Sequence, residues 1–284
     1  MKNIVIPRPE EFDKKKRIFA REGNEKIHVV SDFDRTLTKA FVDGEKISSI
    51  ISQLRKGDYL SEDYVKRAYE LYDKYHPIEV DAKIPLEEKK KEMYTWWKTH
   101  KLLLIEAGLN IKDIKHIVDN GPLEFREGAS DFFDLINNEN IPLIIFSASG
   151  IGEAIPLYFK KINKLYDNVH IVSNSLSYDE SGKAVSIKEP IIHVFNKGEI
   201  ALAGFPIQQE LKDKKNVILL GDSLGDLGMT EGFDYDNIIR IGFLNYEDEE
   251  KLEDYEEKFD VIITGDSDMN FVNDFMKEIL EWKK

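Results

Sequence analysis

Four short apolar runs in the chain each end in small or polar residues, at 27–30, 143–146, 169–172 and 217–220. A strand that is buried on both faces shows little polar alternation, so these runs predict the interior of a parallel sheet. Residues 261–263 predict a further strand of this kind. Helical spacing separates the runs, for example at Ala129–Asn138 and 151–165. The chain therefore predicts an α/β fold.

The stretch from residue 41 to residue 125 follows a different pattern. Its apolar positions recur with helix-like spacing over 47–54, 59–75, 86–108 and 111–120, and it contains no convincing strand. We therefore expect an all-helical domain of residues 41–125, inserted after the first strand of a core. Residues 1–40 and 126–284 would form that core.

Two shorter segments carry a pattern of their own. Residues 176–187 predict a β-hairpin, because Asp179 and Gly182 lie in its polar centre. The acidic run 246–258 predicts a solvated helix face.

Composition excludes several classes of protein. The 284 residues are 42% hydrophobic, which is enough to bury a core, and the formal net charge of −14 argues against a nucleic-acid or anionic-membrane binder. Without cysteine the chain has no thiol nucleophile, Cys-type zinc site or disulfide. No signal-peptide pattern is visible, and no apolar run approaches the roughly 20 residues that span a bilayer. We expect a soluble, cytoplasmic protein.

Carboxylates and a hydroxyl follow the predicted strands. Asp32 and Asp34 come after the first run, Ser147 after the second, and Asp222 and Asp226 after the fourth. In open parallel sheets ligands bind at the carboxyl ends of the strands. Converging carboxylates repel one another unless a cation lies among them, and hard oxygen ligands favour Mg²⁺. The pattern predicts metal-assisted phosphate chemistry.

The segment 32–38 holds two carboxylates in suitable positions for phosphoryl transfer. Asp32 would attack phosphorus, and Asp34 would protonate the leaving oxygen and later accept a proton from water. The two roles require pKa values that are driven apart. The alternative is a polar turn in which Thr36 caps a helix.

Two further segments would bind the phosphate. Residues 147–152 precede a helix, whose free backbone N–H groups can hold an anion, although an ordinary loop would look the same. Lys197 is an isolated lysine after an apolar stretch. A surface lysine is the default interpretation, but phosphate chemistry among many carboxylates needs a fixed cation.

These motifs, in this order, resemble the haloacid dehalogenase superfamily of phosphohydrolases. The similarity is greater to its cytosolic 5′-nucleotidase III branch, the pyrimidine 5′-nucleotidases, and it extends from about residue 25 to the C-terminus. The segments that match are 31–37, 78–81, 86–89, 145–148, 192–197, 218–227 and 241–245.

The resemblance implies a Rossmann-like parallel-sheet core with a helical cap, and it implies a role for each motif. Asp32 would be the nucleophile and Asp34 the acid/base. Mg²⁺ would bind the Asp32 carboxylate, the backbone carbonyl of Asp34 and the Asp222 carboxylate, supported by Asp226 and Thr36. Ser147, the Ala148 amide and Lys197 would hold the phosphoryl group.

The same resemblance places base recognition in the cap. Glu79 would accept hydrogen bonds from the base. Trp97 would stack on it, although packing between cap and core explains a tryptophan equally well. His100 falls where relatives carry a small hydroxyl residue that contacts the base, which leaves pyrimidine and methylated purine nucleotides both open.

Together these inferences predict a Mg²⁺-dependent 5′-nucleotidase that hydrolyses nucleoside 5′-monophosphates, CMP and UMP first, through an aspartyl-phosphate. Phosphotransfer to a nucleoside is a plausible side reaction. The alternatives are a 7-methylguanosine monophosphate nucleotidase, a phosphatase of the same superfamily acting on phosphoserine or a sugar phosphate, and a non-catalytic module that binds nucleotide and Mg²⁺. The sequence predicts no nucleic-acid or membrane partner and leaves the oligomeric state open.

Overall fold

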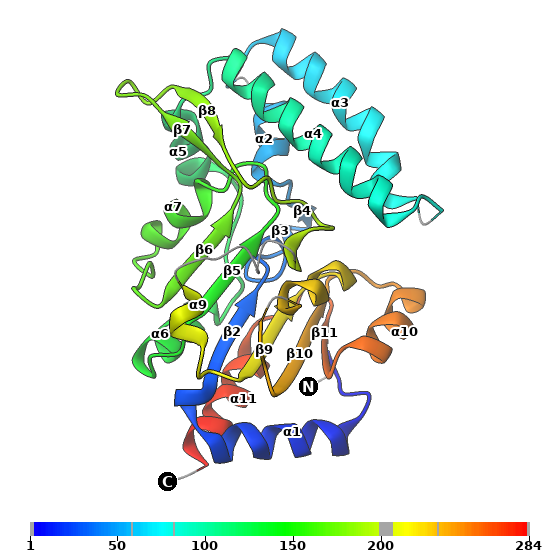
Figure 1. Cartoon of the computed structure of the whole chain (residues 1–284), viewed down its shortest axis with the longest axis vertical. Helices are drawn as coiled ribbons and strands as arrows, with labels where there is room; N and C mark the ends of the chain where they lie inside the picture. Colours follow the sequence, from blue (N-terminus) through cyan, green and yellow to red (C-terminus); the bar gives the residue numbers. More distant parts are fainter. Residues whose placement is uncertain (1–2, 58, 82, 199–206, 232, 283–284) are drawn as a thin grey trace.

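The computed structural model describes residues 3–57, 59–81, 83–198, 207–231 and 233–282. Its centre is a seven-stranded sheet in the order β1-β11-β10-β9-β2-β5-β6 (Figure 1). The strands are β1 (Ile4–Val5), β2 (Ile27–Ser31), β5 (Leu143–Ser147), β6 (Val169–Ser173), β9 (Asn216–Gly221), β10 (Asn237–Leu244) and β11 (Val261–Thr264). All neighbours are parallel except β1, which pairs antiparallel with β11. The predicted α/β fold with a parallel sheet is confirmed.

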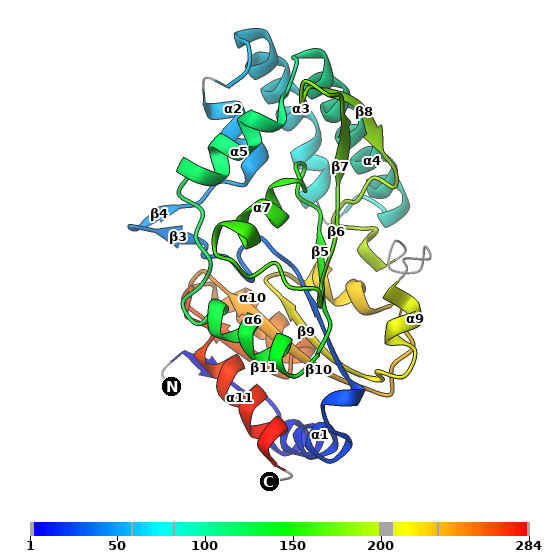
Figure 2. The same ribbon diagram turned by 90° about the vertical axis from the view of Figure 1, so that its left-hand side faces the viewer.

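Successive residues of the central strands face opposite layers of the core. Val29 of β2 packs in a layer with the helices α1 (Pro9–Glu22), α6 (Ala129–Asn138), α7 (Ala154–Lys161) and α11 (Asn270–Glu281). Val30 packs in the other layer, with α9 (Ile207–Leu211) and the 3₁₀ helix η2 (Leu224–Thr230). Figure 2 looks onto the layer that contains α6 and α7. This double cover explains why the strands lack polar alternation.

Helices dominate the stretch between residues 41 and 125, as predicted. They are α2 (Ile50–Lys56), α3 (Glu62–Val80), α4 (Leu86–Glu106) and α5 (Ile111–Asn120). The long helices α3 and α4 lie side by side at the end of the molecule away from α1 (Figure 1). We call these helices the cap; the domain boundaries at residues 41 and 125 stay a prediction.

One detail of the cap differs from the expectation of helices alone. It begins with a small hairpin of β3 (Phe41–Val42) and β4 (Glu45–Lys46). Asp43 and Gly44 form its turn with φ of 52° and 79°, the left-handed geometry that an Asp-Gly pair favours. Strands of two residues are too short to show an alternating pattern.

Two other segments agree with the sequence pattern. The predicted hairpin is formed by β7 (Ser175–Tyr178) and β8 (Ala184–Lys188), and β8 packs against α4. The acidic run forms α10 (Glu249–Lys258), in which Tyr255 is the buried residue. A single 3₁₀ turn, η1 (Asn24–Lys26), leads into β2.

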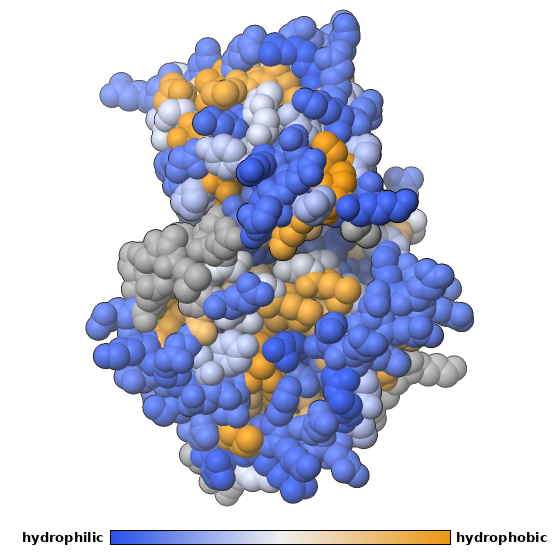
Figure 3. All heavy atoms as spheres, turned by 45° about the vertical axis from the view of Figure 1, so that its right-hand side comes forward, coloured by the Kyte–Doolittle hydropathy of each residue, from blue (hydrophilic) through white to orange (hydrophobic). Residues whose placement is uncertain are grey.

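The surface in Figure 3 is mostly hydrophilic, in keeping with the charge of the chain, and it is hollowed between the cap and the sheet region. In the part of the chain that the structure describes, no helix combines the length and apolarity needed to cross a bilayer.

Candidate active site

The strand register brings the predicted motifs to one edge of the sheet. β2 lies between β9 and β5, and Ser31 pairs with both Leu220 and Ile145. The backbone N–H of Asp32 donates to the carbonyl of Leu220 at 3.0 Å. Asp32, Ser147 and Asp222 therefore all stand at the carboxyl ends of three adjacent strands.

Three carboxylates from these ends converge. One oxygen from each of Asp32, Asp222 and Asp226 lies within 4.8 Å of the others, and we call this group the acid cluster. Lys197 Nζ lies 2.5 Å from Asp32 Oδ1 and 2.8 Å from Asp226 Oδ1. The ammonium is almost completely buried between them. Among the described residues, Lys197 thus contacts Asp32 and Asp226 but forms no ion pair with Asp222, and the four groups carry a formal charge of −2 when all three acids are ionised.

The titration of these groups reflects that imbalance. Burial raises the pKa of Asp222 well above its usual range, and the neighbouring Asp226 and Asp32 raise it further. Burial also raises the pKa of Asp32, although Lys197 opposes the shift. Burial alone would lower the pKa of Lys197, but Asp226 and Asp32 outweigh it and raise that pKa above its ordinary value.

The acid cluster has the chemistry of a magnesium site. Its donors are carboxylate oxygens, which hard divalent cations prefer, and a charge of +2 would balance the formal charge of −2 that the cluster and Lys197 carry together. Asp226, predicted as a supporting residue, lies inside the cluster. Its Oδ2 also accepts from Ser223 N at 3.0 Å and from Ser223 Oγ at 2.9 Å, which caps η2.

Asp34 lies close to the cluster but outside it. Its side chain is half-buried, and burial raises its pKa, while Arg35 and Lys197 oppose the rise. A carboxyl with a raised pKa suits the predicted acid/base role. Thr36 is fully buried; its hydroxyl has no hydrogen-bond partner among the described residues, and its carbonyl accepts from Arg126 Nε at 2.8 Å.

The predicted phosphate loop follows β5. Ser147 is buried and its Oγ accepts from the N–H of Ser149 at 3.1 Å, while Ala148 is half-buried. Asn174, which the sequence analysis did not single out, braces this loop. Its amide donates to the carbonyls of Ser149 at 3.1 Å and Ile192 at 2.8 Å and accepts from the Ile192 N–H at 2.9 Å. It thus ties the loop to the segment that leads to Lys197.

Trp97 joins the cap to this loop. A Cβ atom on Gly150 would lie 2.5 Å from Trp97 Cζ3, so the indole rests directly on the glycine backbone. Trp97 also stacks with His100, with ring centroids 6.2 Å apart and planes 13° apart. His100 is buried, its Nε2 lies 3.1 Å from the Tyr64 hydroxyl, and burial lowers its pKa to about 3.

Glu79 lies near the end of α3, where its side chain is a quarter exposed and its Oε2 lies 3.1 Å from His76 Nδ1. Its carbonyl accepts from Lys89 Nζ at 2.9 Å, and the same ammonium lies 5.2 Å from the centre of the Phe195 ring. Phe195 lies two residues before Lys197 in the chain and packs against a hydrophobic cluster of the cap that is formed by Tyr75, Met93 and Trp96. The roles assigned to these cap residues stay predictions.

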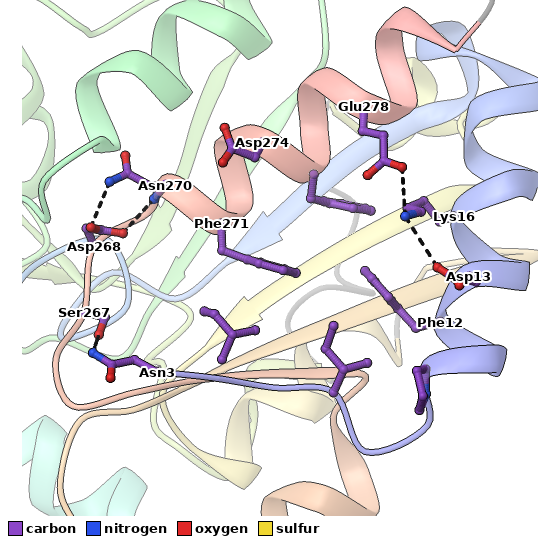
Figure 4. Close-up of a pocket in the computed structure, with 14 residues that line it drawn as sticks. Asn3, Phe12, Asp13, Lys16, Ser267, Asp268, Asn270, Phe271, Asp274 and Glu278 are labelled. Carbon is purple, nitrogen blue, oxygen red and sulfur yellow. Dashed lines mark hydrogen bonds and ion pairs between the residues drawn. The ribbon is translucent and has the colours of Figure 1, made fainter. Parts of the chain in front are cut away.

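A separate cavity of about 910 Å³ lies between α1 and α11, away from the acid cluster (Figure 4). Phe12, Phe271 and Phe275 supply apolar walls, and Lys16 contacts Asp13 and Glu278 at its rim. None of the predicted site residues lines it.

Sequence comparison identifies the family to which the chain is similar. The family model described as pyrimidine 5′-nucleotidase (UMPH-1) matches residues 35–280. The chain is 35% identical to the 7-methylguanosine phosphate-specific 5′-nucleotidase of Gallus gallus over 278 residues, which are 98% of this chain and 96% of the relative. Its identity to the enzyme of that name from Homo sapiens is 36% over 259 residues, covering 91% and 86%.

Solved structures show the same relationship. A crystal structure of cytosolic 5′-nucleotidase IIIB bound to cytidine superimposes with a TM-score of 0.86 at 28% identity, covering 100% of this chain and 95% of that one. A probable phosphoserine phosphatase from Vibrio cholerae shares the fold, with a TM-score of 0.55 at 11% identity, covering 92% and 68%.

Proposed function

We propose a substrate and a mechanism for this chain, which belongs to the pyrimidine 5′-nucleotidase family and is a 5′-nucleotidase, a phosphoric monoester hydrolase of the haloacid dehalogenase fold. The proposed substrates are 7-methylguanosine monophosphate, preferred, and the pyrimidine nucleotides CMP and UMP. The buried contact of Lys197 with two members of the acid cluster is the observation that carries the chemistry.

In the first step Asp32 attacks phosphorus. A bond forms between its carboxylate oxygen and phosphorus as the bond from phosphorus to O5′ of the nucleoside breaks, and Asp34 gives its proton to that leaving oxygen. Ser147, the Ala148 amide and Lys197 hold the phosphoryl oxygens. In the second step Asp34 takes a proton from water, whose oxygen attacks phosphorus and releases Asp32 and inorganic phosphate.

The acid cluster, together with the carbonyl of Asp34, would hold Mg²⁺. The ion would offset the charge of the attacking carboxylate and of the phosphoryl oxygens. The formal charge of −2 on the cluster and Lys197 together supports this assignment, as does Asp222, the one member of the cluster that Lys197 does not contact.

The proposed preference for a methylated purine rests on the attraction between its cationic base and two cap residues, Glu79 and Trp97. The base of 7-methylguanosine is cationic, whereas cytosine and uracil are neutral at pH 7. A carboxylate such as Glu79 and an indole face such as Trp97 both favour a cationic ring. The names of the curated relatives support the same preference. The preference for CMP and UMP that the sequence predicts becomes the second choice.

A phosphate-release screen tests the proposal. Wild-type enzyme with Mg²⁺ is assayed on 7-methylguanosine monophosphate, CMP, UMP, GMP, phosphoserine and a sugar phosphate. We expect turnover on the first three nucleotides and loss of all of it in Asp32→Asn, whose fold is checked by circular dichroism. Wild-type-like turnover in Asp32→Asn would refute the nucleophile, and preferred hydrolysis of phosphoserine or the sugar phosphate would refute the substrate class.

A second experiment isolates base recognition. Glu79→Gln keeps the shape of the side chain and removes its charge, and we expect kcat/KM on 7-methylguanosine monophosphate to fall by about tenfold, the size of one charge-assisted hydrogen bond. The rate on phosphoserine should not change. Glu70→Gln, on an exposed carboxylate of the same helix, is the matched control. An unchanged ranking of substrates would remove Glu79 from the base site.

A further inference from the structure

Arg126 follows the cap in the chain, and all five N–H donors of its guanidinium find acceptors. Nε donates to the Thr36 carbonyl at 2.8 Å. Nη1 donates to Asp266 Oδ1 at 2.9 Å and to the Ser267 carbonyl at 2.6 Å. Nη2 donates to the Arg35 carbonyl and to Asn245 Oδ1, both at 2.5 Å. The guanidinium is completely buried, and its central carbon lies 4.6 Å from the centre of the Phe243 ring.

The turn that Arg126 grips has a strained backbone. Arg35, the residue after Asp34, has a φ of 63°, in the left-handed region that a side chain with a Cβ disfavours. Its carbonyl accepts a second hydrogen bond from Asn245 Nδ2 at 3.0 Å, and its N–H donates to Thr38 Oγ1 at 2.8 Å. Such a conformation persists only where surrounding contacts determine it.

The same contacts anchor both connections between core and cap. Asp266 accepts from Arg126 and also from the backbone N–H groups of Ala40 and Phe41, each at 2.8 Å, where the chain leaves the core. On the return connection the N–H of Arg126 donates to the carbonyl of Leu37 at 2.9 Å. Arg126 therefore joins the catalytic turn, the outgoing connection and the loop before α11 in one buried unit.

We propose that Arg126 is a positioning residue for the acid/base Asp34, and that Asn245 assists it. By holding the carbonyls of Arg35 and Thr36, the two residues fix the direction in which the chain turns immediately after Asp34. That turn sets where the Asp34 carboxyl points and where its carbonyl lies. The inference rests on the proposed function, because it assigns Arg126 to the acid step of that reaction.

The test compares two leaving groups. A nucleoside is a poor leaving group that needs a proton from Asp34, whereas p-nitrophenolate leaves with little acid assistance. General acid catalysis contributes on the order of 10²- to 10⁴-fold, so we expect Arg126→Lys to lose about 10- to 100-fold in kcat on CMP and only a few-fold on p-nitrophenyl phosphate. Lysine keeps the charge but cannot reach five acceptors.

Asn245→Leu provides a second variant with a similar volume. It removes the donor to the Arg35 carbonyl and one acceptor of Arg126. We therefore expect smaller losses of kcat than in Arg126→Lys, but again a greater loss on CMP than on p-nitrophenyl phosphate. If Arg126→Lys does not fold, this variant decides the question by the same ratio. Lys39→Gln is the matched control, because its side chain pairs with Glu124 across the two connections and does not bind the carbonyls of Arg35 and Thr36 that Arg126 holds; its ratio should equal that of the wild type.

The outcomes separate the two proposals. Unequal losses, larger on CMP, support the positioning role. Equal losses on both substrates mean that Arg126 acts only on the amount of folded enzyme, and they overturn the inference while the proposed function stands. A wild-type enzyme that hydrolyses neither substrate overturns the proposed function and this inference with it.

Discussion

Replacing Lys197 by methionine removes the ammonium that contacts two carboxylates of the acid cluster. The methionine keeps most of the side-chain volume, so the packing around the position changes little. Asp32 and Asp226 would lose the ammonium that now lies 2.5 Å and 2.8 Å from their oxygens. The variant therefore measures what a single cation contributes to the three carboxylates of the acid cluster, of which Asp32 and Asp226 are buried.

The magnitude follows from the geometry. At an effective dielectric constant of about 20, each contact corresponds to a gross attraction of about 6 kcal/mol, which the loss of hydration on burial offsets in large part. Removing one partner of a buried ion pair nevertheless costs about 3–5 kcal/mol, because the remaining charge stays buried without compensation. We expect Lys197→Met to lower the free energy of unfolding of the metal-free protein by that amount.

Urea denaturation in EDTA, repeated with Mg²⁺, is the assay. Mg²⁺ should raise the stability of Lys197→Met by more than it raises that of the wild type, since the more negative cluster binds the cation more tightly. Phosphate release should fall by about 10²- to 10³-fold, as for the loss of one group that stabilises transition-state charge.

Lys16→Met is the matched control, because Lys16 also bridges two carboxylates. Its Nζ lies 2.9 Å from Glu278 and 3.4 Å from Asp13, but both acids are about half exposed. Exposed pairs contribute about 0–1 kcal/mol. A loss of under about 1 kcal/mol in Lys197→Met, equal to that of the control, would refute the assignment of Lys197 as the counterion of the cluster.

Two other predictions concern the phosphate loop and acid stability. In Gly150→Ala the new Cβ would lie 2.5 Å from Trp97 Cζ3 and 2.9 Å from Ile51 Cδ1, so we expect a loss of about 1–3 kcal/mol in urea unfolding and a raised KM for nucleotides; Gly228→Ala, with nothing closer than 3.9 Å, should change neither, and a normal KM in Gly150→Ala would contradict the contact. Burial lowers the pKa of His28 to about 4, so the stability that its neutral ring confers is complete above about pH 6.5 and is lost as the pH falls toward 4, at about 1.4 kcal/mol per pH unit. Urea unfolding between pH 7 and 5 should show a shallower decline in His28→Leu and an unchanged one in the exposed control His116→Gln; parallel curves for His28→Leu and the wild type would show that His28 contributes nothing.

Much of the fold is readable from the sequence because both faces of its sheet are covered. Mostly apolar runs mark β2, β5 and β9, and a residue of the predicted site ends the strand or directly follows it. The strand β10 escapes this pattern, since Arg240 and Gly242 interrupt it. Glycine is required at position 242 because Phe259 packs against it: a Cβ there would lie 2.9 Å from the Phe259 ring. No local pattern reveals such a contact.

The site divides in the same way. Asp32, Asp222 and Lys197 are predicted from residue type and order, because each follows an apolar stretch after a single small or polar residue. Arg126 and Asn174 are not predicted, because they bind backbone carbonyls. Every residue has a backbone carbonyl, so the sequence does not show which carbonyl a side chain will bind. Position in the chain predicts which side chains gather at the edge of the sheet, while the residues that bind the backbone around them are found only from tertiary contacts.

Phe195 has a consequence for the independence of the two halves of the enzyme. Its ring packs against Tyr75, Met93 and Trp96, and it lies two residues before Lys197, which contacts Asp32. A movement of the cap away from the sheet would either expose the Phe195 ring to water or move the backbone of Lys197 together with the cap. A different cap domain fused to this sheet region would therefore have to provide a new apolar pocket for the Phe195 ring. Without that pocket, Lys197 would lose its position beside Asp32.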